Sequence, residues 1–165
     1  MNLLSIYKPN SKNSGHAMSV SISKDFDAKN NKVAPSIMVE IVKQSSWDNS
    51  KKQGSFKHPK GSKDKKTLMK LTDSEVGDII YSIEKGKTFS AFHKFGDSSK
   101  SIKIVTEGTE RKIKGQDSET VRLVKFGITE NSIGFYLLLT AGESQLFIES
   151  LRFGLSNIFN SKNNA

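Results

Sequence analysis

The chain has 165 residues, 35% of them hydrophobic, with no cysteine, which excludes disulfides, Cys-ligated zinc sites and iron–sulfur clusters. A chain of this length forms one domain of ordinary size and buries about 70% of its unfolded surface. Its 26 Lys and Arg residues exceed its 17 Asp and Glu residues, so the formal net charge of +9 favours an anionic partner.

Four strands are predicted in the first half of the chain, and the clearest is the second. There Met18, Val20 and Ile22 alternate with small or polar residues, which is typical of a sheet with one face in water. Residues 24–35 are expected to form a polar turn region. The predicted strands cover residues 3–8, 16–23, 37–43 and 67–71.

Two capping boxes predict two helices. Thr72 stands three residues before Glu75, an apolar stripe at helical spacing follows, and Gly86 is a plausible stop. Thr140 and Glu143 repeat the box before the second helix. Between the two helices we expect four more strands, over residues 89–95, 101–106, 120–128 and 132–139.

Each predicted helix closes a block of four predicted strands. The sequence therefore predicts an α+β fold of two four-stranded antiparallel sheets, each followed by a helix, in the order ββββαββββα. We expect residues 1–160 to form a single domain. A flexible basic loop is expected at 43–66, and a disordered tail at 161–165.

The segment 43–66 is the most strongly charged part of the chain, with eight lysines against two aspartates. Trp47 and Phe56 lie within it. Lysines neutralise phosphates while rings stack on unpaired bases, so this pattern is typical of a protein that binds single-stranded nucleic acid. The alternative is a solvated, mobile loop with Trp47 folded back on the sheet. The candidate contacts in this segment are Lys43, Trp47, Lys51, Lys52, Phe56 and Lys57.

Further candidates lie on the predicted strands. Phe92 and Lys94 share one side of the strand 89–95, which we expect to be exposed, although Phe92 in the core is an alternative. A ring and a cation also stand together near the start of the chain, at Tyr7 and Lys8, where packing at a sheet edge is the alternative. Three further cations on predicted strands would extend a track of basic side chains, and these are Lys103, Arg122 and Lys125. The alternative is that they only keep the edge of a sheet soluble.

No catalytic or metal-binding pattern emerges. His16, His58 and His93 are widely separated and have no helical His pair, so we expect no metal and no cofactor. The segment 85–92 partly matches the signature of an RNA-recognition motif, but that fold has only four strands. We therefore expect a protein that is not an enzyme.

The predicted order and the basic loop resemble the Whirly-type fold, which plant Whirly proteins share with kinetoplastid mitochondrial RNA-binding proteins and which is related to the positive-cofactor-four coactivators. The Lys-Gly-Lys-Ala motif of plant Whirly proteins corresponds here to Ser-Gly-His-Ala at residues 14–17, so the first Lys of the motif is lost. Three segments, 6–10, 15–19 and 43–48, are similar to phage-encoded single-stranded-DNA-binding proteins. The resemblance implies binding of single strands across the sheets and assembly into oligomers through the helices.

These observations predict a single-stranded-DNA-binding protein with little sequence specificity that coats and protects strands in phage-type replication or recombination. The alternatives are an RNA-binding or annealing regulator, and a structural or assembly protein without catalytic activity. A homodimer or tetramer is expected. Because no apolar run of membrane-spanning length and no secretory signal is present, we expect no membrane partner and a cytoplasmic location, in the host cytoplasm if the protein is viral.

Overall fold

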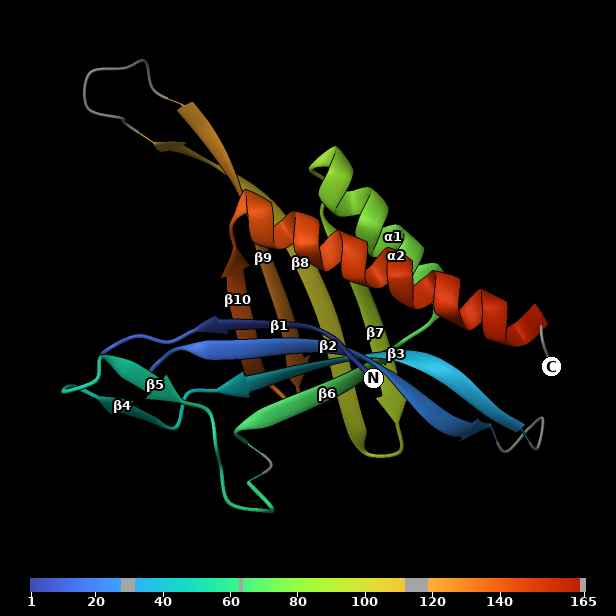
Figure 1. Ribbon diagram of the computed structural model, residues 1–165, viewed down its shortest axis with the longest axis horizontal. Helices are drawn as coiled ribbons and strands as arrows, with labels where there is room; N and C mark the ends of the chain where they lie inside the picture. The colour runs from blue at the N-terminus through green and yellow to red at the C-terminus, as the bar shows by residue number, and fades with distance from the viewer. Residues whose placement is uncertain (28–31, 63, 112–118, 164–165) are drawn as a thin grey trace.

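The computed structural model describes residues 1–27, 32–62, 64–111 and 119–163 (Figure 1). Within these ranges ten strands and two helices form an α+β architecture, and the strands belong to three antiparallel sheets. Figure 1 shows the two helices lying together on one side of the molecule. It also shows the strands of the two larger sheets crossing at a steep angle.

The first sheet has the spatial order β1 (Asn2–Lys8), β2 (His16–Asp27), β3 (Lys32–Lys43) and β6 (Lys66–Leu71). Ile6 lies opposite Met18, and all four strands direct alternate apolar residues into the core, as predicted. The polar turn predicted at 24–35 is wrong over most of its length, because β2 and β3 continue as a paired ribbon until Asp27 faces Lys32. Backbone pairing does not require alternating apolar residues. The paired strands therefore extend beyond the apolar alternation from which the sequence predicted them.

The helix α1 (Asp73–Lys85) begins and ends as predicted. The Glu75 backbone N–H donates to the Thr72 hydroxyl, and the Glu75 carboxylate accepts from the Thr72 N–H. Gly86 ends the helix with a φ of 64°, a left-handed conformation that favours glycine. Burial alone would raise the pKa of Glu75, but hydrogen bonds from Thr72 and His93 outweigh it and hold that pKa below its ordinary value.

The second sheet has the spatial order β10 (Ile133–Leu139), β9 (Glu119–Glu130), β8 (Ser98–Arg111) and β7 (Phe89–Phe95), and α2 (Ala141–Asn163) follows it in the chain. The α2 capping box is confirmed, since the Glu143 N–H donates to the Thr140 hydroxyl and the Thr140 N–H to the Glu143 carboxylate. The helix continues to Asn163, so residues 161–163 of the expected disordered tail are helical, because no Gly or Pro stands among them to end the helix.

The predicted twofold ββββα arrangement is wrong, although the α+β class is right. Segment 43–66, expected as one loop, contains β4 (Ser46–Asp48) and β5 (Gln53–Ser55), which pair as a third, two-stranded sheet. Three-residue strands are too short to produce a readable alternation. We call residues 46–55 the arm.

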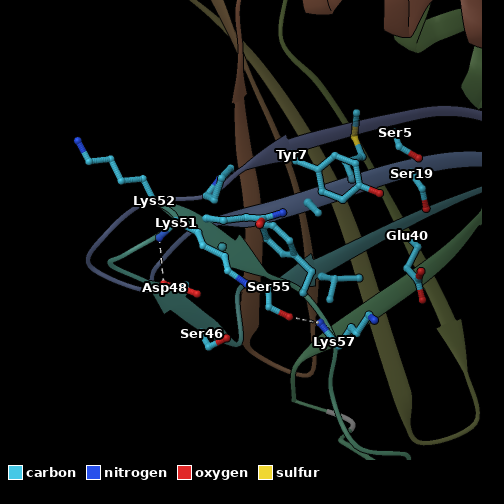
Figure 2. A pocket seen from close by; sticks show the side chains of 17 residues that line it. Ser5, Tyr7, Ser19, Glu40, Ser46, Asp48, Lys51, Lys52, Ser55 and Lys57 are labelled. Carbon is cyan, nitrogen blue, oxygen red and sulfur yellow. Dashed lines mark hydrogen bonds between the residues drawn. The ribbon is translucent and has the colours of Figure 1, made fainter.

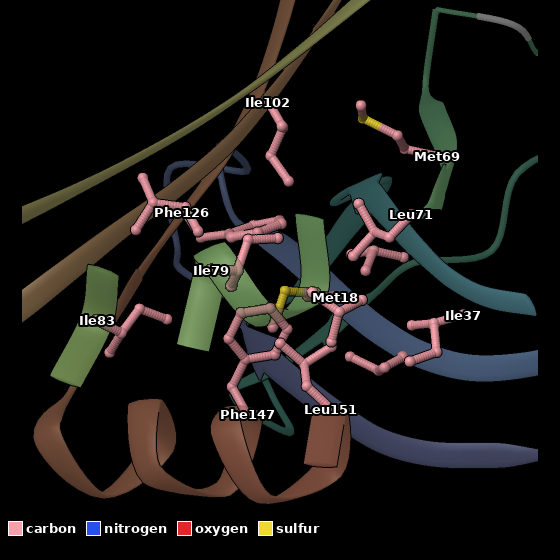
Figure 3. Packing of buried hydrophobic residues seen from close by; sticks show 14 of the residues in the cluster. Met18, Ile37, Met69, Leu71, Ile79, Ile83, Ile102, Phe126, Phe147 and Leu151 are labelled. Atoms are coloured by element: carbon pink, nitrogen blue, oxygen red, sulfur yellow. The ribbon is translucent and has the colours of Figure 1, made fainter. Parts of the chain in front are cut away.

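One apolar core joins the two larger sheets and both helices. The inner faces of the sheets contribute Met18 and Phe126, and α1 and α2 contribute Ile79 and Phe147 (Figure 3). The Phe126 and Phe147 rings meet edge to face with centroids 5.1 Å apart. Because the helices and the other sheet cover only one face of each sheet, the opposite faces are free to form a functional surface.

Candidate nucleic-acid interface

The exposed face of the first sheet, here called the first outer face, carries the side chains that alternate with the core residues. It is mostly small and polar, but Tyr7 is 62% exposed and Leu68 is 44% exposed. Along this face Tyr7 stands opposite Ala17, and Glu40 stands opposite Leu68. It consists of Ser5, Tyr7, Ala17, Ser19, Met38, Glu40, Val42, Lys66, Leu68 and Lys70.

The arm lies next to the first outer face and encloses a cleft of about 950 Å³ (Figure 2). The sheet lines one wall of the cleft through Tyr7, Ser19 and Glu40, and the arm lines the other. Figure 2 shows Lys51 and Lys52 projecting from the turn of the arm. The arm residues at the cleft are Ser46, Asp48, Lys51, Lys52, Gln53, Gly54 and Ser55, and Phe56 and Lys57 follow them.

A buried glutamine holds the arm against the sheet. Gln44 is 5% exposed, and its Oε1 accepts from the Asn10 N–H at 2.9 Å. Its Nε2 donates to the carbonyls of Asn10 and Ser46, both at 3.0 Å. Two glycines let the backbone approach the Gln44 amide closely. A Cβ at Gly15 would lie 2.4 Å from the Gln44 Oε1, and a Cβ at Gly54 would lie 3.0 Å from its Nε2. The arm is therefore positioned by side-chain hydrogen bonds as well as by its own pairing.

Two aromatic rings meet at the cleft. The Tyr7 and Phe56 centroids are 5.7 Å apart, with the ring planes inclined by 55°. Phe56 is half-buried and also lines a second cavity of about 420 Å³, together with His58, Lys60 and Lys66. Because Phe56 lines both cavities, they form a continuous track over the first outer face.

The track is predominantly positive. Lys51, Lys52 and Lys57 are exposed at the cleft. Of the two carboxylates there, Asp48 accepts from the Ser50 hydroxyl and the Lys51 N–H, which hold its pKa below the ordinary value. The Glu40 carboxylate pairs with Lys66 at 3.1 Å. Both carboxylates thus serve local structure and leave most of the lysine charge uncompensated.

The exposed face of the second sheet, here called the second outer face, is also aromatic and basic. Phe92 is 66% exposed and Tyr136 is 54% exposed. Lys94, Lys103 and Lys125 are exposed on the same face, and the Lys125 ammonium lies 4.9 Å from the centre of the Tyr136 ring. The alternative in which Phe92 belongs to the core is wrong.

Four predicted contacts lie away from these surfaces. Lys8 points to the other side of β1, where it pairs with Glu143 of α2. Lys43 likewise lies on the inner side, with its ammonium 4.6 Å from the centre of the Phe135 ring. Arg122 lies beside Gly86 at the end of α1, because it shares the inner side of β9 with the core residues. Trp47 is half-buried, and strand alternation directs it away from the cleft that its neighbours line.

Several residues at or directly beneath these surfaces were not identified from the sequence as contacts: Gln44, Tyr136 and His58. Tyr136 carries a readable signal, because it alternates with Phe135 and Leu137 of the core. Gln44 carries none, since its hydrogen bonds join segments 34 residues apart. Among the described residues, no group of three or more His, Asp and Glu side chains is placed to hold a metal ion.

Comparison with protein-family models, with curated proteins and with solved structures finds no match to this chain. Neither described helix has the length and apolar character needed to cross a membrane.

Proposed function

We propose that this protein binds single-stranded DNA with little sequence specificity and is not an enzyme. The observation that carries the proposal is the cleft in which Tyr7 and Phe56 lie among exposed lysines. Lysines neutralise phosphates and release counterions, whereas a ring stacks on any base at about 1–3 kcal/mol. Duplex DNA hides the faces of its bases, so a site built from rings favours unpaired nucleotides.

The second outer face supplies the same chemistry. Phe92 and Tyr136 are more than half exposed, and lysines surround them. A strand longer than the cleft would therefore find further stacking partners and cations on the same protein. We propose that both outer faces bind one strand, which fits a role in coating and protecting single strands during phage-type replication or recombination in the cytoplasm, in the host cytoplasm if the protein is viral.

The three segments that resemble phage single-stranded-DNA-binding proteins support this proposal by where they lie. Segments 6–10, 15–19 and 43–48 supply Asn10, Gly15 and Gln44, which together anchor the arm. The resemblance thus involves the residues that shape the cleft.

Self-association is also proposed. Three apolar side chains of α2 are exposed at the surface, and these are Leu146 at 57%, Phe153 at 55% and Phe159 at 48%. A dimer or tetramer in which these residues pack against a second copy would bring several clefts together on one strand. Light scattering of the purified protein measures the number of subunits.

The central test is titration of fluorescent oligo-dT, an RNA of matched length and a duplex of equal length, each at two salt concentrations. We expect oligo-dT to bind best, with an affinity that falls steeply as salt rises. Tyr7→Ala should weaken binding by about 5- to 150-fold, the equivalent of one lost stack of about 1–3 kcal/mol. The matched control is Tyr81→Ala, because Tyr81 is 50% exposed on α1, away from both outer faces.

Charge reversal tests the lysines separately. Lys51→Glu, Lys52→Glu and Lys57→Glu together should abolish binding while leaving the fold intact, since all three side chains are exposed. Preference for the duplex, or affinity unchanged by these substitutions, would refute the proposal. Preference for the RNA would identify the protein as an RNA-binding regulator instead.

A further inference from the structure

A third cavity, of about 470 Å³, lies where the end of the first sheet meets Tyr136 of the second. Its charged and titratable lining residues are His16, Lys43, His58, Lys65 and Tyr136, and no carboxylate is found among the described residues that line it. Lys65 also pairs at 2.7 Å with Asp64, whose side chain is 58% exposed. Two lysines and two histidines thus supply positive charge and hydrogen-bond donors to the cavity.

His16, which lines this cavity, has an unsatisfied ring nitrogen. Its Nε2 is buried and has no hydrogen-bond partner among the residues that the structure describes. His16 lies opposite Lys43 in the β2–β3 register, and its ring centroid is 5.2 Å from that of Tyr136. A buried polar atom without a partner costs about 1–3 kcal/mol, so its presence in a folded protein needs an explanation.

The surroundings of His16 favour its neutral form when the cavity holds no anion. Burial, followed by the nearby charge of Lys43, lowers the pKa of His16, and the Ser14 backbone opposes this only in part. The charge on the neighbouring strand, Lys8, is already paired with Glu143 of α2. An anion in the cavity would offset the charge of Lys43, favour the protonated ring and accept a hydrogen bond from its Nε2–H.

We propose that this cavity binds a phosphate group, with His16 and Lys43 as its inner ligands and Lys65 at its entrance. Gln44 lines the same cavity and also anchors the arm, so the phosphate lies next to the cleft. Tyr136 connects it to Lys125 on the second outer face. Which phosphate binds here rests on the proposed function. A phosphodiester of a bound strand in this cavity would let the strand pass from one outer face to the other. A terminal or free phosphate would occupy the cavity alone.

The test follows the His16 ring by NMR while inorganic phosphate is added to the full chain. Sodium chloride at equal ionic strength is the reference. We expect a saturable shift of the His16 signals with phosphate and a rise in the pH at which His16 titrates. Lys43→Met and the exposed Lys65→Met should each weaken phosphate binding, Lys43→Met by about tenfold, as expected for a lost charge-assisted hydrogen bond. Lys12→Met, an exposed lysine of the β1–β2 connection, should not.

Oligo-dT with and without a 5′-phosphate then identifies the source. A His16 shift with both oligonucleotides supports a phosphodiester ligand, and a shift with the phosphorylated one alone supports a terminal phosphate. If inorganic phosphate saturates the site but neither oligonucleotide binds the protein, the phosphate site stands and the proposed function fails. A His16 response to phosphate that does not saturate, or that equals the response to chloride, would overturn the site even if oligo-dT binds the cleft.

Discussion

Gln44→Met tests whether one buried side chain holds the arm over the first sheet. Methionine has nearly the length and volume of glutamine, so the change removes three hydrogen bonds, two to Asn10 and one to Ser46, without opening a large cavity. A hydrogen bond contributes about 0.5–1.5 kcal/mol net. Because Asn10 is half-buried and Ser46 is exposed, water replaces part of the loss. We expect destabilisation by about 2 kcal/mol, or about 4–8 °C in Tm for a chain of this size.

Urea denaturation and thermal melting measure the change in the free energy of unfolding, and oligo-dT titration measures the change in affinity. Affinity should fall about tenfold, because binding must then order an arm that is no longer anchored. Gln53→Met is the matched control, since Gln53 is exposed on the arm, and its effect should stay within about 0.5 kcal/mol. If Gln44→Met were as mild as the control, the arm would be held by its backbone pairing alone, and our account of the cleft would be wrong.

Three further predictions concern the fold that supports these surfaces. Phe126→Ala should cost about 3–5 kcal/mol in unfolding free energy, because the ring is fully buried at the centre of the core, and urea denaturation would measure it. Gly154→Ala should cost about 1–3 kcal/mol in the same assay, since a Cβ there would come within 2.8 Å of Ile37 under α2; an unchanged midpoint would mean that the helix shifts freely. Burial raises the pKa of Glu75, but hydrogen bonds, including one from His93, hold it below its ordinary value, so its contribution to stability is present above about pH 4.5 and is lost as the pH falls through the lower folded-state value. Melting curves from neutral to acid pH should therefore show a loss of Tm that is smaller in Glu75→Gln, and equal losses in both proteins would contradict the assignment.

The sequence was sufficient wherever a structural signal spans only a few residues. Both capping boxes were readable because Thr72 with Glu75, and Thr140 with Glu143, satisfy the first backbone N–H groups of a helix locally. Alternation likewise identified the face of β7 that carries Phe92 and Lys94, because successive side chains of a strand point to opposite sides.

Tertiary structure decided everything that depends on contacts between distant segments. The sequence placed Trp47 and Arg122 among the contacts by residue type, and only the folded chain directs one away from the cleft and the other toward α1. Gln44 acquires its role from Asn10, which lies 34 residues before it, and the cavity that we propose for phosphate arises where His16 of one sheet meets a ring of the other. Local chemistry determines helix ends and strand faces, whereas a binding surface depends on which distant groups the packed core brings together. Which distant residues become neighbours cannot be read from a single sequence, because no local pattern records it.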